Sequence, residues 1–283
     1  MQDGMSVKLL AVCAALSVSL AACGGGSGSS VAMSSDNSGG TINSSTGGGG
    51  GTSGGSGTTT TLASDCLNVG LLSAGSTWHL EYDKSGDATG TLVSDATVSG
   101  STIFQGNAAM EIVQTIVDTS QAGSVRAESK NYQRLDGASI LSFGMVADVS
   151  GALAGSVNIV SIPPQADNRY TLAAGESSTS HRTVVNIKNF PAMSGIVFVP
   201  QTSSSASILT VTYAGRETVT VPAGTFDACR FDTRAGDASA ALTSSEWIVP
   251  ASGVVVRTVS YSNGNPALTT TLRAGTLNGT VIK

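Results

Sequence analysis

The chain has 283 residues, of which only 12% are charged, and its formal net charge is −5. Because soluble proteins average about 25% charged residues, the polar surface here must consist mainly of Ser, Thr, Asn and Gly. The acidic balance and the absence of any basic run exclude a nucleic-acid-binding protein and a polybasic membrane patch. This composition is typical of exported β proteins and unlike that of a cytosolic helical enzyme.

The first 22 residues have the three zones of an export signal. Lys8 supplies a positive charge, Leu9–Ala22 is apolar apart from two serines, and small residues end the segment. The apolar run is too short to span a bilayer, which requires about 20 residues. We therefore predict a signal peptide over residues 1–22, with translation starting at Met1 or Met5.

The residues Leu20-Ala21-Ala22-Cys23 resemble the lipobox of bacterial lipoproteins. The resemblance implies cleavage before Cys23, a lipid on its sulfur and an acyl chain on its new amino group. A thiolate is the nucleophile that this chemistry needs, and several acyl chains suffice for stable anchoring. Gly24, in place of Asp, implies sorting to the outer membrane, so the expected partner is that membrane. The alternative is an ordinary signal peptide with Cys23 present by chance.

The segment that follows reads as a tether. Between residues 24 and 61 there are 14 Gly and 10 Ser, and Asp36 is the only charge. So little apolar surface cannot offset the entropy of ordering, and we predict a disordered linker over residues 23–61. Residues 51–55 match the G-x-S-x-G pattern, which has meaning only between a strand and a helix.

Residues 62–283 are predicted to form one all-β domain, since 222 residues can bury a single core. Thr77–Asp83 shows the alternation expected of a half-buried strand, with Trp78, Leu80 and Tyr82 on one face.

Other runs of strand character continue to the end of the chain. Residues 65–72 are expected to hold a short helical turn, and no longer helical stripe is present. Asn263-Gly264 between two such runs predicts a hairpin. We expect an antiparallel sheet of roughly 11 to 14 strands, arranged as an incomplete barrel or a sandwich. The predicted runs are 92–98, 101–105, 110–118, 124–133, 140–149, 156–162, 182–190, 207–213, 217–221, 226–233, 244–249, 253–261, 267–274 and 276–282.

Residues 217–229, which contain the run V-P-A-G-T-F, are followed by Trp247 to Pro250 and Gly253 to Val255. Together they resemble a pattern in uncharacterised bacterial envelope lipoproteins, some of which adopt the LolA/LolB-like incomplete barrel. That resemblance implies an antiparallel sheet curled around an apolar groove, and a lipid or amphiphilic ligand. It carries no catalytic residue.

Two cysteines remain in the predicted domain. Cys13 leaves with the signal peptide and Cys23 is acylated, so Cys66 and Cys229 are left in an oxidising compartment. We predict a disulfide between them, which would close a loop of 162 intervening residues. The alternative is a pair of buried free thiols.

The histidines and aspartates give no sign of a metal site. His79 and His181 are far apart in sequence, without zinc-ligand spacing. Asp83, Asp87 and Asp95 do not match a calcium-binding loop. We predict no metal and no cofactor.

Arg257 alternates with Val255 and Val259. The pattern places this charge inward, either as a snorkelling edge residue or facing an anionic ligand. The sequence does not indicate other ligand-binding residues or protein partners.

Three functions remain open. The first is a noncatalytic envelope lipoprotein that binds an apolar or amphiphilic ligand in a β groove. The second is a structural or protein-interaction module of the outer membrane. A tethered hydrolase is disfavoured, because no serine has a distinguishing context and no catalytic constellation is evident.

Overall fold

The predicted signal peptide (1–22) and the linker beginning with Cys23 (23–61) lie outside the residues that the structure describes, and they remain predictions. The structure is a computed structural model. It describes residues 62–120, 123–151, 155–189 and 201–283.

The described residues form thirteen β-strands and three short 3₁₀ helices, and none of their helices is long and apolar enough to cross a membrane. The 3₁₀ helices are η1 (Ala63–Cys66), η2 (Val69–Leu72) and η3 (Arg169–Thr171). The strands are β1 (Thr77–Gly86), β2 (Gly90–Phe104), β3 (Asn107–Ser120), β4 (Gly123–Asp136), β5 (Ser139–Gly151), β6 (Gly155–Asp167), β7 (Ser177–Asn189), β8 (Gln201–Val221), β9 (Gly224–Ala235), β10 (Leu242–Ile248), β11 (Val255–Ser262), β12 (Asn265–Leu277) and β13 (Thr280–Val281).

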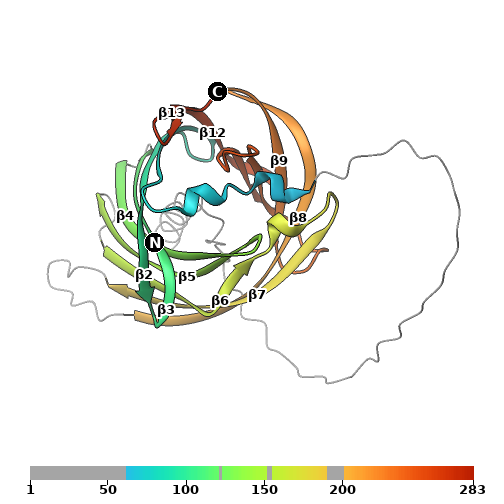
Figure 1. Ribbon diagram of the computed structural model, residues 1–283. Helices are drawn as coiled ribbons and strands as arrows, with labels where there is room; N and C mark the ends of the chain where they lie inside the picture. Colours follow the sequence, from blue (N-terminus) through green and yellow to red (C-terminus); the bar gives the residue numbers. More distant parts are fainter. Residues whose placement is uncertain (1–61, 121–122, 152–154, 190–200) are drawn as a thin grey trace, which may run out of the picture.

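The sheet closes on itself (Figure 1). Each strand pairs with the next one along the chain, and β1 also pairs with β12, from Trp78↔Leu277 to Gly86↔Leu268. The predicted all-β antiparallel class and the strand number are confirmed. The outcome is a closed twelve-stranded barrel with β13 added to β12. In an incomplete barrel, β1 and β12 would each have an edge of unpaired backbone N–H and C=O groups. Closure pairs these groups with one another.

Some predicted pairs of strands are single strands with a bulge. The register of β2 shifts between Val98 and Gly100, and that of β8 between Tyr213 and Gly215. Gly100 and Gly215 have φ of 127° and 109°, values that L-residues with a Cβ rarely adopt. The glycines that resemble turn signals in the sequence therefore mark bulges within continuous strands.

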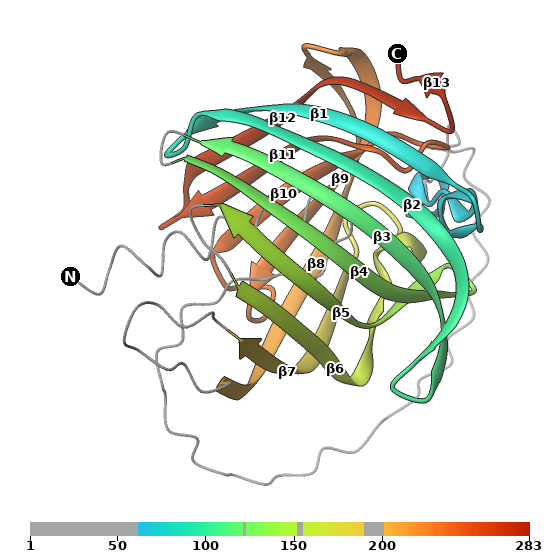
Figure 2. The ribbon, with the colours of Figure 1, turned by 90° about the vertical axis from the view of Figure 1, so that its left-hand side faces the viewer.

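The apolar faces of the strands point into the barrel. In β1, Trp78, Leu80 and Tyr82 are 8%, 5% and 1% exposed, whereas His79 and Glu81 between them are partly exposed. This pattern places the main core inside the barrel, whose wall of strands is seen from the side in Figure 2.

The interior also contains charge. Lys84 and Asp118 are 8% and 7% exposed, and the Lys84 ammonium donates to both Asp118 carboxylate oxygens at 2.9 and 2.7 Å. Such a pair is tolerated in a core because each charge is met by the other.

Candidate functional site

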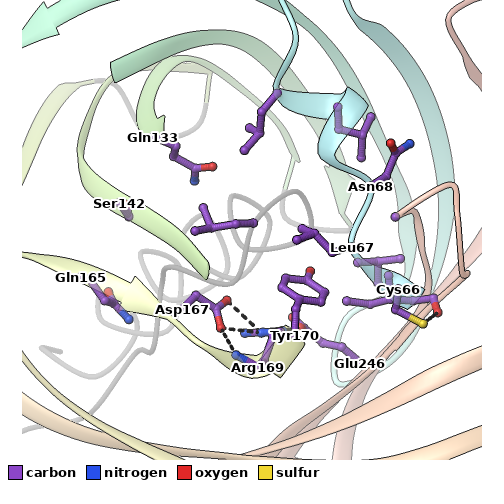
Figure 3. Close-up of a pocket in the computed structure, with 16 residues that line it drawn as sticks. Cys66, Leu67, Asn68, Gln133, Ser142, Gln165, Asp167, Arg169, Tyr170 and Glu246 are labelled. Atoms are coloured by element: carbon purple, nitrogen blue, oxygen red, sulfur yellow. Dashed lines mark hydrogen bonds and ion pairs between the residues drawn. The ribbon is translucent and has the colours of Figure 1, made fainter. Parts of the chain in front are cut away.

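A cavity of about 70 Å³ lies inside the barrel, beneath η1 and η2 (Figure 3). The segment that carries these two 3₁₀ helices, drawn in blue in Figure 1, lies across the interior of the ring of strands. The backbone N–H of Ala63 in η1 donates to the carbonyl of Leu172 at 3.0 Å, which ties the segment to the residues after η3.

Much of the cavity lining is apolar. η2 and the segment between η1 and η2 contribute leucines, and strands β5, β10 and β11 contribute branched side chains. Such a surface holds hydrocarbon without directional contacts. The apolar lining consists of Leu67, Leu71, Leu72, Ile140, Ile248 and Val255.

A row of polar side chains crosses the neighbouring strands β4, β5 and β6. Gln133 is paired in register with Ser142, and Ser142 with Gln165. Residues directly opposite one another in a sheet point to the same face, and all three side chains line the cavity. The Gln165 side-chain oxygen accepts a hydrogen bond of 3.4 Å from Arg182, a buried residue behind the lining.

Arg169 bridges two carboxylates at the base of the cavity. Its side chain is 4% exposed, and its Nη1 donates to Glu246 Oε2 at 2.6 Å while its Nε lies 2.8 Å from Asp167 Oδ2. Burial acts to lower the pKa of the guanidinium, but the charges of Asp167 and Glu246 outweigh it, so the pKa is raised. Arg169 is therefore always charged, and this charge is engaged by its two partners.

Gln133 has no such partner. Its side chain belongs to a residue only 3% exposed, yet its Oε1 accepts no hydrogen bond. Leaving a buried carbonyl unpaired carries a desolvation penalty of about 1–3 kcal/mol, and native proteins rarely do so without a reason. This oxygen has almost no accessible surface, so it is an unpaired acceptor buried behind the cavity lining rather than exposed to the cavity.

Tyr170, in η3, points its ring into the group of lining residues (Figure 3). Burial raises the pKa of its hydroxyl far above the ordinary value of 10. The hydroxyl remains protonated and can donate as well as accept a hydrogen bond.

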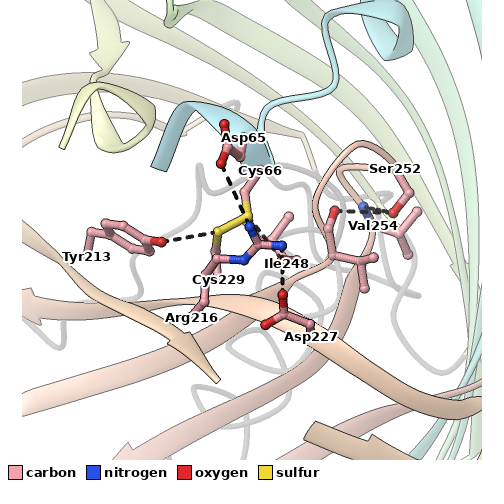
Figure 4. The surroundings of a disulfide bond; sticks show 10 residues. Asp65, Cys66, Tyr213, Arg216, Asp227, Cys229, Ile248, Ser252 and Val254 are labelled. Atoms are coloured by element: carbon pink, nitrogen blue, oxygen red, sulfur yellow. Dashed lines mark hydrogen bonds and ion pairs between the residues drawn. A yellow bond between two sulfur atoms is a disulfide. The ribbon is translucent and has the colours of Figure 1, made fainter. Parts of the chain in front are cut away.

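A disulfide holds the segment that covers the cavity. Cys66 of η1 is bonded to Cys229 of β9, with Cα atoms 6.3 Å apart and both residues fully buried (Figure 4). The Tyr213 hydroxyl lies 3.6 Å from the Cys229 sulfur. Nearby, Arg216 lies 2.7 Å from an Asp227 oxygen and 3.8 Å from one of Asp65. Since Cys66 also lines the cavity, the covalent bond keeps η1 in place over it.

The histidines lie away from the cavity. His79, on the outer face of β1, lies 2.6 Å from Asp95 and 3.1 Å from Glu81. Hydrogen bonds to Asp95 and then to Glu81 raise the pKa of His79. His181 is exposed. No group of His, Cys, Asp and Glu among the described residues is arranged to hold a metal ion.

The inward placement of Arg257 is wrong. Arg257 is paired with Trp247, and its guanidinium lies 4.9 Å from the centre of that ring. Glu246 and Ile248, on either side of Trp247, line the cavity, so Trp247 and Arg257 occupy the outer face. The register shift between Trp247 and Ile248 inserts one extra residue into β11, which reverses the alternation that begins at Val255.

Sequence reasoning missed the polar residues of the cavity. Glu246 and Gln133 each lie in a predicted strand whose apolar and polar residues alternate. A polar residue at a position that the alternation directs toward the core was the signal that could have identified them. Arg169 lies in a connection without periodicity, so nothing in the sequence connects it to Glu246, which lies 77 positions away.

Comparison with known proteins leaves the family open. No protein-family model matches the chain, and no curated protein matches it. Among solved structures, it is similar to a protein of Parabacteroides distasonis described provisionally as a lipoprotein, with 14% identity, a TM-score of 0.31, and 72% of this chain and 96% of that chain covered. It is also similar to a Bacteroides fragilis protein, described provisionally as exported and with a YmcC-like fold, with 13% identity, a TM-score of 0.36, and 75% and 97% covered. At these values the role of the chain has to be argued from its own residues.

Proposed function

We propose that the chain is an exported bacterial lipoprotein, anchored in the outer membrane through lipid on Cys23, whose barrel binds a small amphiphilic ligand. The lipobox-like residues Leu20 to Cys23 and the Gly/Ser-rich tract after them support the anchor. The bond between Cys66 and Cys229 supports an oxidising compartment, where disulfides persist.

The cavity beneath η1 and η2 carries the ligand-binding part of the proposal. Its lining holds both apolar and polar side chains, which suits a molecule with both characters. The combination of branched apolar and polar side chains around one cavity is the single observation that carries the binding role.

The size of the cavity sets the scale of the ligand. Its volume of about 70 Å³ is well below the several hundred Å³ of pockets that enclose drug-sized molecules. It has room for roughly two to five water molecules or a group of similar size. The fitting ligand is therefore a short-chain amphiphile or the small head of a larger one, rather than a whole acyl chain as the LolA/LolB resemblance implies.

The described lining favours binding over catalysis. It contains no histidine, and Cys66 is held in the disulfide. The two carboxylates, Asp167 and Glu246, are both paired with Arg169. A general base would have to be released from that ion pair before it could act.

Native mass spectrometry of the full chain, extracted from membranes in mild detergent, tests the ligand. We expect a bound small molecule on the wild-type protein and none on Ser142→Leu, which places a larger apolar side chain in the cavity lining. Wild-type protein without any bound molecule would refute the binding role.

The anchor is tested separately by Cys23→Ser. We expect this variant to leave the membrane fraction, because the sulfur is the predicted attachment point. A variant that stays attached after a salt wash would refute the lipid anchor and leave the cavity argument intact.

A further inference from the structure

We infer that the free edge of β7, over Ser177 to His181, is a docking site for an extended peptide segment of a partner protein, which adds to the barrel wall as one more strand. Residues 177–181 do not line the cavity. The docking site therefore stands or falls independently of the proposed ligand.

The pairing of β6 with β7 ends partway along both strands. Their register runs from Ser156↔Asn189 to Ser161↔Val184, and no described strand pairs with residues 177–183 of β7 on that side. On the other side, the same residues stay paired with β8 along their whole length. Over this stretch β7 therefore has one edge in use and one edge free.

The alternation of the β7–β8 ladder shows which backbone groups face the free edge. The Tyr213 N–H donates to the Glu176 carbonyl at 2.9 Å, so the even-numbered residues of β7 bond β8 and the odd-numbered ones face away. Ser177 Oγ and Thr179 Oγ1 lie 2.8 and 2.9 Å from threonine hydroxyls of β8, as expected for non-hydrogen-bonded pairs, whose side chains lie closest. The N–H and C=O groups of Ser177, Thr179 and His181 thus point to the free edge, where no described residue bonds them.

Two prolines prevent β6 from covering this edge. Opposite Phe143 of β5, β6 has four residues, 161–164, which bulge from the sheet. Pro163 and Pro164 in this bulge have no N–H to donate, and prolines on an edge block further pairing. Residues 177–183 of β7 contain no proline. The edge of β6 is therefore protected against another strand, and the edge of β7 is not.

The gap between the two strands is accessible from outside. Ser177, Thr179, His181 and Pro163 are exposed, and Ile162 is 57% exposed. Because β6 and β7 are joined at one end of the gap, a second folded barrel could not bring one of its own strands alongside β7. A single extended segment can, since strands pair at a spacing of about 4.8 Å and an edge of backbone groups is matched by another backbone.

The inner face of the gap limits the peptide to small residues there. Arg182 Nη1 donates to Gln165 Oε1 at 3.4 Å, so these two side chains join β7 to β6 on the inner side. An added strand would place alternate side chains over this contact, where Gly, Ala or Ser fits. Its other side chains would face outward beside Thr179 and Ile162, where β-branched residues fit. The expected segment therefore alternates small and β-branched residues.

The probe is a fluorescein-labelled peptide, Thr-Ala-Thr-Ala-Thr-Ala-Thr, whose binding to the full chain in detergent is measured by fluorescence anisotropy. The N–H groups of its outward threonines would bond β7, and those of its alanines would face away. N-methylation of the threonines should weaken binding by about tenfold or more, because several hydrogen bonds are lost together. N-methylation of the alanines is the matched control and should leave the affinity nearly unchanged.

Thr179→Pro tests the same edge from the side of the protein. It removes an N–H that the β8 ladder does not use, so the barrel should keep its midpoint in urea unfolding while peptide binding falls as it does for the methylated threonines. Thr179→Val removes only the hydroxyl and should bind the peptide like the wild type. If Thr179→Pro unfolds, the two methylated peptides decide the question on the wild-type protein.

Equal affinities of the two methylated peptides, or no binding of the parent peptide, would overturn the docking site. Amide hydrogen exchange of the full chain without peptide distinguishes other occupants of the edge. Protection of Thr179 and His181 that rises with protein concentration would assign the edge to a second copy. Protection that is independent of concentration would assign it to another segment of the same chain, and either result would overturn the inference.

Discussion

Replacing Gln133 by Met should stabilise the ligand-free protein, although Gln133 is one of its most deeply buried polar residues. Met preserves the length of the side chain and removes the amide. Gln133 is 3% exposed, and its Oε1 has no hydrogen bond. Removing this oxygen should therefore raise the free energy of unfolding by the desolvation penalty of an unpaired carbonyl, about 1–3 kcal/mol. For a domain of this size, each kcal/mol raises Tm by about 2–4 °C.

The assay is urea unfolding of the ligand-free full chain, in which the midpoint should rise without a change in the slope. Gln114→Met is a matched control, because Gln114 is 1% exposed and its Nε2 donates to Ser94 Oγ at 2.9 Å. The same chemical change there leaves a buried hydroxyl without its partner and should lower the free energy of unfolding by about 1–3 kcal/mol.

Opposite signs for the two variants would support the reasoning. If Gln133→Met lowers the stability as much as Gln114→Met does, Oε1 of Gln133 must have a hydrogen-bond partner in the folded protein. The assignment of this oxygen as an unpaired buried acceptor would then be refuted.

Three further predictions concern charge, covalent linkage and pH. Lys84→Met should lower the free energy of unfolding by about 3–5 kcal/mol, since it leaves Asp118 buried without its partner. Adding Asp118→Leu should restore most of this loss, as measured by urea unfolding. A double variant without any recovery would contradict the pairing. Replacing Cys66 and Cys229 by Ser should cost about 2–5 kcal/mol, and alkylation of the unreduced, denatured wild-type protein should label neither cysteine, whereas labelling of both would exclude the bond. Folding raises the pKa of His79 above 6.5, so its contribution to the free energy of unfolding is complete below that pH and is lost as the pH rises through the folded pKa. Between pH 6 and pH 8, His79→Gln should therefore lose less stability than the wild type, by under about 1 kcal/mol because the ion pairs are exposed. Identical pH profiles for the two proteins would refute the assignment.

The sequence by itself determined the elements and the faces of most strands. Alternation in Thr77–Asp83 specified which side chains of β1 are buried, because the period of a strand is two. Asn263-Gly264 specified a hairpin, and the structure confirms it with φ of 51° and 79° at these residues, the positive values that a type I′ turn requires. Such features depend on interactions within a few residues, so local sequence carries them.

The tertiary structure alone decided how distant segments meet. Pairing of β1 with β12 closes the barrel through residues almost two hundred positions apart, such as Trp78 and Leu277, and no local pattern names a partner strand. The same closure brings Gln133 and Glu246 to one cavity with Arg169. One inserted residue in β11 turned Arg257 outward. Register and ring closure depend on the summed packing of all twelve strands, and periodicity within one strand cannot supply that information.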